Sequence, residues 1–174
     1  MQLHEIVCYG NPRLQEPSAP VSTVDAAVRE LVADMFRIMY DAPGVGLAAP
    51  QIGVNKRIFV VGFEEKRQKT ELAVINPKIT GFFGEEVPYE EGCLSVPGIS
   101  ALVMRPSGIM LEGLDLEGKP FTIRTDGFLA RVIQHEYDHL EGKLFVDRLD
   151  AEEMERIAGA LKRLGKRTKK KLAG

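Results

Sequence analysis

The stretch DGFLARVIQHEYDHLE, from Asp126 to Glu141, decides the fold of this 174-residue chain. Its apolar positions predict a helix, which Asp126 can cap and which Gly142 can end in a left-handed conformation. Most sides of this helix are apolar, through Phe128, Leu129, Val132, Ile133 and Leu140. The helix is therefore expected to lie in the protein interior, where polar side chains are costly unless they have partners.

The polar residues of this helix form an HExxH motif, made by His135, Glu136 and His139. Residues four apart on a helix are neighbours on one face, so both imidazoles can bind one metal ion. Glu136 lies one step round the helix, where its carboxylate can act as a general base on a water molecule without binding the metal. The motif predicts a metal-dependent hydrolase.

A third metal ligand is needed, because catalytic sites of this kind use three protein ligands and leave one position for water. No His or Cys follows His139, although carboxylates are available there at Glu141, Asp147, Asp150 and Glu152. Upstream, Cys93 lies in the sequence EEGCLSVPG, residues 90–98. A lone cysteine is more often a buried structural thiol, but beside an HExxH motif without a third ligand we favour metal binding by Cys93.

The other elements indicate an α+β protein, in which small antiparallel sheets pack around the HExxH helix. An N-terminal helix, which Ser22 or Thr23 can cap, precedes the motif, and a C-terminal helix begins at Asp150, with Glu153 placed for a capping box. Strand-like runs cover residues 57–63, 72–75, 108–114 and 120–125. The last two runs are separated by a short turn and are expected to form a hairpin.

Length and composition indicate a single catalytic domain, residues 1–149, with a helix and a basic tail appended at residues 150–174. Hydrophobic residues make up 44% of the chain, and the net charge of −2 gives no overall bias towards nucleic acid or membrane. The tail differs from the rest, because residues 162–174 contain seven basic residues and no acidic ones.

The two cysteines do not make a disulfide framework, and they fit a reducing compartment in which thiols stay free. The first ten residues are of mixed polarity, and no apolar run approaches the ~20 residues that span a bilayer. The expected location is therefore the cytoplasm, away from membranes, and the expected state is a monomer. Cys8 and His4 are expected to be structural.

Three segments of the chain resemble the peptide deformylases. They are GVGLAAPQ at residues 44–51, EGCLS at residues 91–95 and QHEYDHLEG at residues 134–142. They match the family's GxGLAAxQ, EGCLS and QHExDHLxG patterns in the same order and at similar spacing. The resemblance covers nearly the whole chain, and it implies an enzyme that hydrolyses N-formylmethionyl peptides to formate and a free amino terminus.

The resemblance also implies the roles of the matching residues. One divalent ion, natively ferrous iron, is held by Cys93, His135 and His139, and zinc, nickel or cobalt can take its place. Glu136 is the general base. The side-chain amide of Gln51 and the backbone N–H of Leu94 stabilise the oxyanion on the former formyl oxygen.

The substrate is expected to lie beside the motifs. The carbonyl of Gly46 can hold the peptide as an added strand, and Gly92 is a further contact. A methionine side chain needs an apolar pocket, and its burial is worth roughly 1.5–3 kcal/mol. The expected walls of that pocket are Val45, Tyr89, Phe128, Val132 and the ring of His135, and simple core packing is an equally good account of each except His135.

Some charged residues near the motifs have open roles. Arg131 lies one turn before His135, where an apolar residue would suit a methionine pocket better, so it either points outward or lines the pocket with its aliphatic stem. Glu91 and Arg105 can form an ion pair that braces the cysteine loop. Asp138 is either a partner of the imidazoles or a surface residue.

Two other functions fit parts of the sequence. A zinc peptidase would use the same HExxH motif with a carboxylate as third ligand, and loss of Cys93 would then leave metal binding intact. A binding module with this fold would have lost catalytic residues, but Glu136 and Gln51 are both present.

The basic tail has two interpretations. Charge runs are usually solvated ends, but this one continues from a capped amphipathic helix, and a substrate of the kind inferred emerges from a ribosome. We therefore expect residues from Asp150 onward to dock on ribosomal RNA near the exit of the nascent chain.

Overall fold

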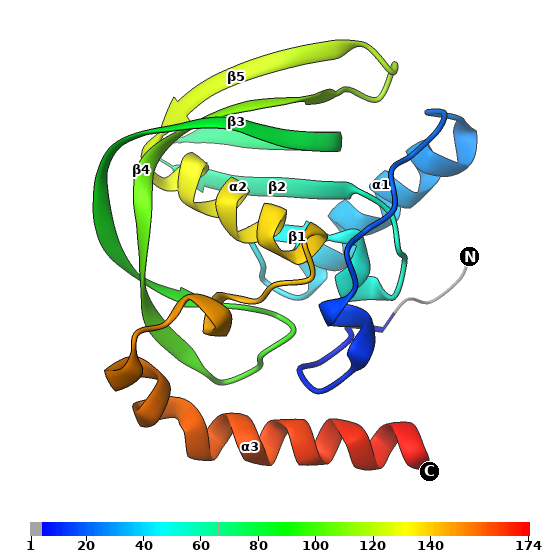
Figure 1. The fold of residues 1–174 in the computed structure, drawn as a ribbon. Coiled ribbons are helices and arrows are strands. Elements are labelled where there is room, and N and C mark those ends of the chain that lie inside the picture. The colour runs from blue at the N-terminus through cyan, green and yellow to red at the C-terminus, as the bar shows by residue number, and fades with distance from the viewer. Residues whose placement is uncertain (1–4, 66) are drawn as a thin grey trace.

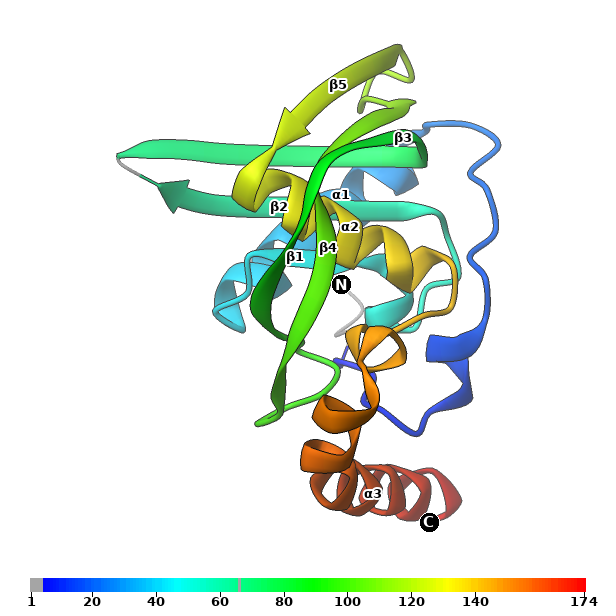
Figure 2. The ribbon, with the colours of Figure 1, turned by 60° about the vertical axis from the view of Figure 1, so that its left-hand side comes forward.

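A computed structural model of the chain describes residues 5–65 and 67–174, and His4 lies outside these ranges. Its centre is helix α2 (Gly127–Leu140), which carries the HExxH motif. Figures 1 and 2 show α2 enclosed by curved strands, with α3 at the opposite end of the molecule from β5. The predicted α+β class, with a central HExxH helix, is confirmed.

The described strands form one antiparallel sheet in sequence order, with β1 and β5 at its edges. They are β1 (Gly46–Ala48), β2 (Ile58–Glu65), β3 (Gln68–Gly92), β4 (Ser100–Leu114) and β5 (Pro120–Asp126). The predicted hairpin is the β4–β5 pair. Strand β3 is far longer than the run expected at residues 72–75, because register shifts between residues 75 and 86 let it bend without ending. The bent β3–β4 pair therefore joins the expected small sheets into one.

Helix α1 (Ala26–Asp41) starts later than the sequence predicted. Its N-cap is Asp25, whose side chain accepts a hydrogen bond of 2.9 Å from the backbone N–H of Val28, so the expected caps Ser22 and Thr23 were wrong. Asp25 lies three residues before the first buried residue of the helix, which places its carboxylate in reach of the free N–H groups of the first turn.

The other two helices begin and end near the predicted positions. Asp150 caps α3 (Ala151–Ala173) by accepting from the N–H of Glu153 at 2.8 Å. The second half of the expected capping box is absent, because the Glu153 carboxylate instead accepts from the N–H of Leu102 at 2.7 Å. Asp126 precedes α2 without a capping hydrogen bond from its side chain, and Gly142 ends that helix with φ +70°.

Three buried clusters position these elements. Helix α1 packs on β1 and β2, and α2 packs on β1, β2, β4 and β5. Helix α3 buries Ile157, Leu161 and Leu164 in a third cluster. That cluster also contains Phe145, from the 3₁₀ helix η3 (Phe145–Arg148), and Val103 of β4. Division of the chain between residues 149 and 150 stays a prediction. None of the helices in the described ranges is long and apolar enough to cross a membrane.

Candidate metal centre

Three donor atoms from two distant segments meet beside α2. The thiol of Cys93 comes from the loop after β3, and the imidazoles of His135 and His139 come from α2, one turn apart. The ligand atoms of the three residues all lie within 4.8 Å of one another, and Cys93 Sγ is 3.3 Å from His139 Nε2. In a tetrahedral zinc site, sulfur and nitrogen ligands lie about 3.6 Å apart. The three side chains therefore fit one ion of this size.

Burial favours the metal-binding form of His139, whereas hydrogen bonds with Cys93 and Glu91 outweigh burial at His135 and raise its pKa well above the usual value. Burial, followed by the positive charge of His135, lowers the pKa of His139 well below its usual value, so that its imidazole stays neutral. Within the described ranges, no other group of three or more metal-ligating side chains lies this close together.

Three of the four carboxylates considered as alternative third ligands have other partners, and the fourth is exposed. Glu141 pairs with Arg57 at 2.7 Å, Asp147 accepts from the N–H of Leu144 at 2.8 Å, and Asp150 caps α3. Glu152 is exposed in the first turn of that helix. The donor set is thus one thiol and two imidazoles, which suits several divalent transition metals.

Glu136 is buried beside the donor atoms, although it is not one of them. Its Oε2 atom has no hydrogen-bond partner among the described residues, and a buried polar atom of this kind calls for a bound water or ion. Burial raises the pKa of Glu136 to about 7, where a carboxyl group can both accept and donate a proton. Gly46 leaves room for it, since any Cβ at position 46 would collide with the Glu136 carboxylate.

The amide of Gln51, from the 3₁₀ helix η2 (Ala49–Ile52), has a defined orientation. Its Oε1 accepts from the backbone N–H of Ala48 at 2.8 Å, so its NH₂ group must face the other way. That group donates to Cys93 Sγ at 3.3 Å and to Ser95 Oγ at 3.2 Å. Gln51 therefore presents N–H donors to the metal centre.

A buried charge network supports His135 from behind. Its Nδ1 is 2.9 Å from Glu91 Oε2, and the Glu91 carboxylate also pairs with Arg105 and Arg131. Burial alone would raise the pKa of Glu91, but hydrogen bonds from His135 and Arg105 outweigh it and hold the pKa well below its usual value. An ionised Glu91 fixes the ring and tautomer of His135, leaving Nε2 for a metal.

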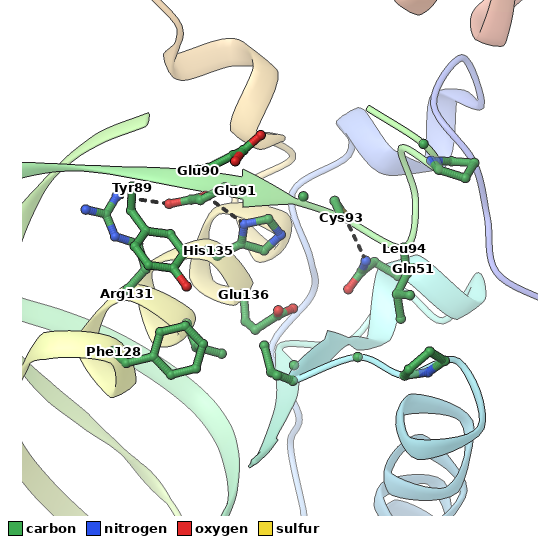
Figure 3. A pocket seen from close by; sticks show the side chains of 18 residues that line it. Gln51, Tyr89, Glu90, Glu91, Cys93, Leu94, Phe128, Arg131, His135 and Glu136 are labelled. Atoms are coloured by element: carbon green, nitrogen blue, oxygen red, sulfur yellow. Dashed lines mark hydrogen bonds and ion pairs between the residues drawn. The ribbon is translucent and has the colours of Figure 1, made fainter. Parts of the chain in front are cut away.

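These groups line one pocket, with a volume of about 460 Å³. Figure 3 shows Tyr89, Phe128 and Arg131 on one side of it, Gln51, Cys93 and Leu94 on the other, and His135 and Glu136 between them. Val45, Gly46, Gly92 and Val132 complete the set of predicted residues in its lining. His139 lies deeper, with 1% of its surface exposed. The structure thus brings all the predicted site residues together.

Sequence reasoning missed or underrated several residues of this centre. Ser95 was not singled out, although it lies in the EGCLS motif and contacts Gln51. Asp138 was expected to be either a partner of an imidazole or a surface residue, and it is neither, because it is buried and pairs with Arg105 at 2.7 Å and with Arg148. The suggested ion pair between Glu91 and Arg105 is present, at 2.6 Å.

A protein with this fold and this centre is a metal-dependent hydrolase: the two imidazoles and the thiolate can hold an ion, and the neighbouring acid can move protons.

Comparison with known proteins narrows that class. A family model described as polypeptide deformylase matches residues 3–155. The peptide deformylase of Acinetobacter baumannii (strain SDF) is 46% identical over 157 residues, covering 90% of this chain and 89% of that protein. The peptide deformylase of Treponema pallidum (strain Nichols) is 50% identical over 146 residues, covering 84% of this chain and 88% of that protein. The chain belongs to the polypeptide deformylase family.

Solved structures agree with this assignment. The plant peptide deformylase PDF1B has a TM-score of 0.94 to this chain at 37% identity, covering 100% of this chain and 97% of its own. A peptide deformylase from Synechococcus elongatus in complex with actinonin has a TM-score of 0.83 at 40% identity, covering 89% and 88%. The predicted deformylase function is confirmed over the alternative of a zinc peptidase with a carboxylate ligand.

Proposed function

We propose that this chain removes the formyl group from N-formylmethionyl peptides, with one divalent ion held by Cys93, His135 and His139. The observation that carries the proposal is the meeting of these three donor atoms, within 4.8 Å of one another, beside the buried acid Glu136. Ferrous iron is the proposed native ion, and zinc, nickel and cobalt are replacements that the same ligand types accept.

The chemistry at this centre divides between the ion and the chain. When bound, the ion supplies Lewis acidity for a carbonyl oxygen and for water. The Glu136 carboxylate accepts a proton from the attacking water and later delivers one to the leaving amine. Its burial beside Gly46 keeps the carboxylate on the substrate side of the ligands, where it can reach both the water oxygen and the amine nitrogen.

The oxyanion that forms on the formyl oxygen needs donors that are already oriented. The NH₂ group of Gln51 meets this need, because its oxygen is held by Ala48 and its nitrogen lies 3.3 Å from the metal-binding thiol. The backbone N–H of Leu94, next to Cys93 in the pocket lining, is the proposed second donor.

The peptide itself is proposed to bind as an added strand. Among the described strands, β2 is the single neighbour of β1, which therefore has a partner on one side only. Its free side meets the pocket at Gly46, and Gly92 lies at the end of β3 in the same pocket. A peptide between them can form main-chain hydrogen bonds on both sides, while its first side chain enters the apolar region lined by Val45, Tyr89, Phe128 and Val132.

A formate-release assay tests this function. The chain should be purified without oxygen, its metal content measured, and its activity compared on formyl-Met-Ala-Ser and acetyl-Met-Ala-Ser. Formate should appear stoichiometrically from the first peptide, and the second should stay intact because the space beside the ion is expected to exclude the larger acyl group. Absence of formate release by the metal-loaded protein would rule out the proposed reaction.

Substitution of Gln51 by Ala is predicted to lower kcat by about 10²–10³, as removal of one oxyanion donor typically does. The measurement is steady-state formate release, with circular dichroism to show that the fold is intact. If only KM rises, Gln51 is a binding residue and its assignment to the oxyanion is wrong.

The C-terminal helix is proposed to dock on the ribosome. All seven basic residues of its second half are exposed: Lys162, Arg163, Lys166, Arg167, Lys169, Lys170 and Lys171. The helix is continuous to Ala173, and its apolar side is buried up to Leu164. These charges are thus presented on an ordered scaffold, where they can neutralise phosphates of the ribosomal RNA. We propose the cytoplasm as the site of action and the monomer as the active state.

Neutralising this basic surface should weaken ribosome binding without affecting catalysis. We predict that a full-length chain with the seven basic residues changed to Gln loses co-sedimentation with ribosomes but still deformylates short peptides. For the unchanged protein, log affinity should fall with log salt by about 0.7–0.9 per phosphate neutralised. Deletion of residues 162–174 should act in the same way, although it also removes the buried Leu164. Equal sedimentation of the neutralised and unchanged chains would refute docking through this helix.

A further inference from the structure

Arg131 is a charged residue in the wall of the substrate pocket. The sequence left open whether its side chain points outward or lines the pocket. In the structure it lines the pocket, and only 6% of its surface is exposed. Figure 3 shows its side chain beside Tyr89 and Phe128, on the side of the pocket away from Cys93. The deformylation steps described above make no use of this buried charge.

The guanidinium group of Arg131 ties α2 to both long strands. Nη1 donates to the backbone carbonyl of Val103 on β4 at 3.0 Å, and Nη2 donates to the carbonyl of Val87 on β3 at 2.6 Å. The group also lies 5.7 Å from the ring centroid of Tyr89. Arg131 therefore fixes the part of β3 that carries a wall of the pocket.

The same guanidinium group completes the hydrogen bonding of Glu91. Oε1 of Glu91 accepts from Arg105 Nε at 2.6 Å and from Arg131 Nη1 at 3.0 Å. Oε2 accepts from Arg105 Nη2 at 2.9 Å and lies 2.9 Å from Nδ1 of His135. An ionised carboxylate offers about four acceptor sites, and here four donors surround it. Glu91 cannot rotate without losing one of them, so the orientation of His135 depends on the whole set.

We propose that Arg131 is a positioning residue, which links the wall of the pocket for the substrate's first side chain to the metal ligand His135 through the Glu91 carboxylate. The pocket half of this inference rests on the proposed function, whereas the metal half rests on the Glu91 contacts alone. Without Arg131, Oε1 keeps a single donor and the carboxylate is free to turn towards Arg105. The hold on His135 then weakens, and the segment of β3 at Val87 and Tyr89 loses its anchor.

The test compares Arg131→Met with a matched control, Arg148→Met. Arg148 belongs to the same network but pairs with Asp138, and its side chain is 41% exposed. The readouts are the thermal unfolding midpoint, the rate at which a chelator removes cobalt from the loaded protein, and kcat and KM on formyl-Met-Ala-Ser. Arg131→Met should release cobalt about tenfold faster than the unchanged chain and should raise KM. About tenfold is the low end of the loss in metal affinity that follows when a hydrogen-bond partner of a metal ligand is removed. Arg148→Met should release it at close to the unchanged rate.

A second variant, Arg131→Lys, separates the two halves of the proposal. Lysine keeps a charge near Glu91, but it lacks the planar fork that reaches Val87 and Val103 at once. It should therefore restore slow cobalt release while KM stays raised. A merely structural role would move both quantities together with the unfolding midpoint.

Slow cobalt release from Arg131→Met, equal to that from Arg148→Met, would overturn the inference. An Arg131→Lys chain that matches the unchanged chain in both cobalt release and KM would also overturn it, as would one that releases cobalt as fast as Arg131→Met. If the Met variant does not fold, the Lys variant alone decides, and a match to the unchanged chain in both quantities overturns the inference. Failure of the proposed function would be distinguishable, because the unchanged protein would then hold cobalt but release no formate.

Discussion

Replacement of Cys93 by Ala is expected to abolish stoichiometric metal binding and deformylation together. Among the described residues, the thiol is one of three donor atoms that converge within 4.8 Å, and the two imidazoles that remain come from a single helix. A thiolate is also the one charged ligand in the set, so its loss removes most of the electrostatic attraction for a divalent ion. The measurement is metal content per chain after gel filtration, alongside formate release and circular dichroism.

Cys8→Ala is the matched control for this experiment. Cys8 is the other free cysteine of the chain, half-buried like Cys93, but it does not line the pocket. Its substitution should leave the metal content near one ion per chain. Full metal occupancy in the Cys93→Ala chain would contradict the proposed ligand set. It would indicate that a carboxylate is the third metal ligand.

Glu136→Gln is expected to keep the metal and lose at least the 10²–10⁴-fold in kcat that is typical of general acid–base catalysis. The amide has nearly the shape of the carboxylate, so it can occupy the same space beside Gly46. It cannot accept the proton of the attacking water. Loss of an interaction used only in the transition state lowers kcat and kcat/KM alike, so KM should change little.

The control for this variant is Glu141→Gln, at the end of the same helix. Glu141 pairs with Arg57, and its side chain is 37% exposed. The Glu141→Gln chain should therefore be nearly as active as the unchanged chain. If the Glu136→Gln chain binds no metal, Glu136 belongs to the ligand set. If it stays active, Glu136 is not the general base.

The sequence alone determined the central helix and the positions of two candidate metal ligands on it. Helical spacing places His135 and His139 on one face whatever surrounds them, because residues four apart lie one turn apart. The apolar residues of the same stretch predicted its burial, and Leu140 and Ile133 are indeed fully buried. Local patterns of this kind also predicted the hairpin of β4 and β5 and the cap of α3 at Asp150.

Only the tertiary structure decided what surrounds those ligands. The network of Glu91, Arg105 and Asp138 joins residues 14 to 33 positions apart, and no spacing in a sequence reports whether such charges are buried together or solvated. The direction of Arg131 depended on the path of β3 past α2, which register shifts in a long strand pair create. The need for glycine at Gly46 likewise follows from the Glu136 carboxylate that packs against it. Side-chain spacing along one helix is a local property, whereas desolvation and pairing of charges depend on the register between strands that are distant in the chain.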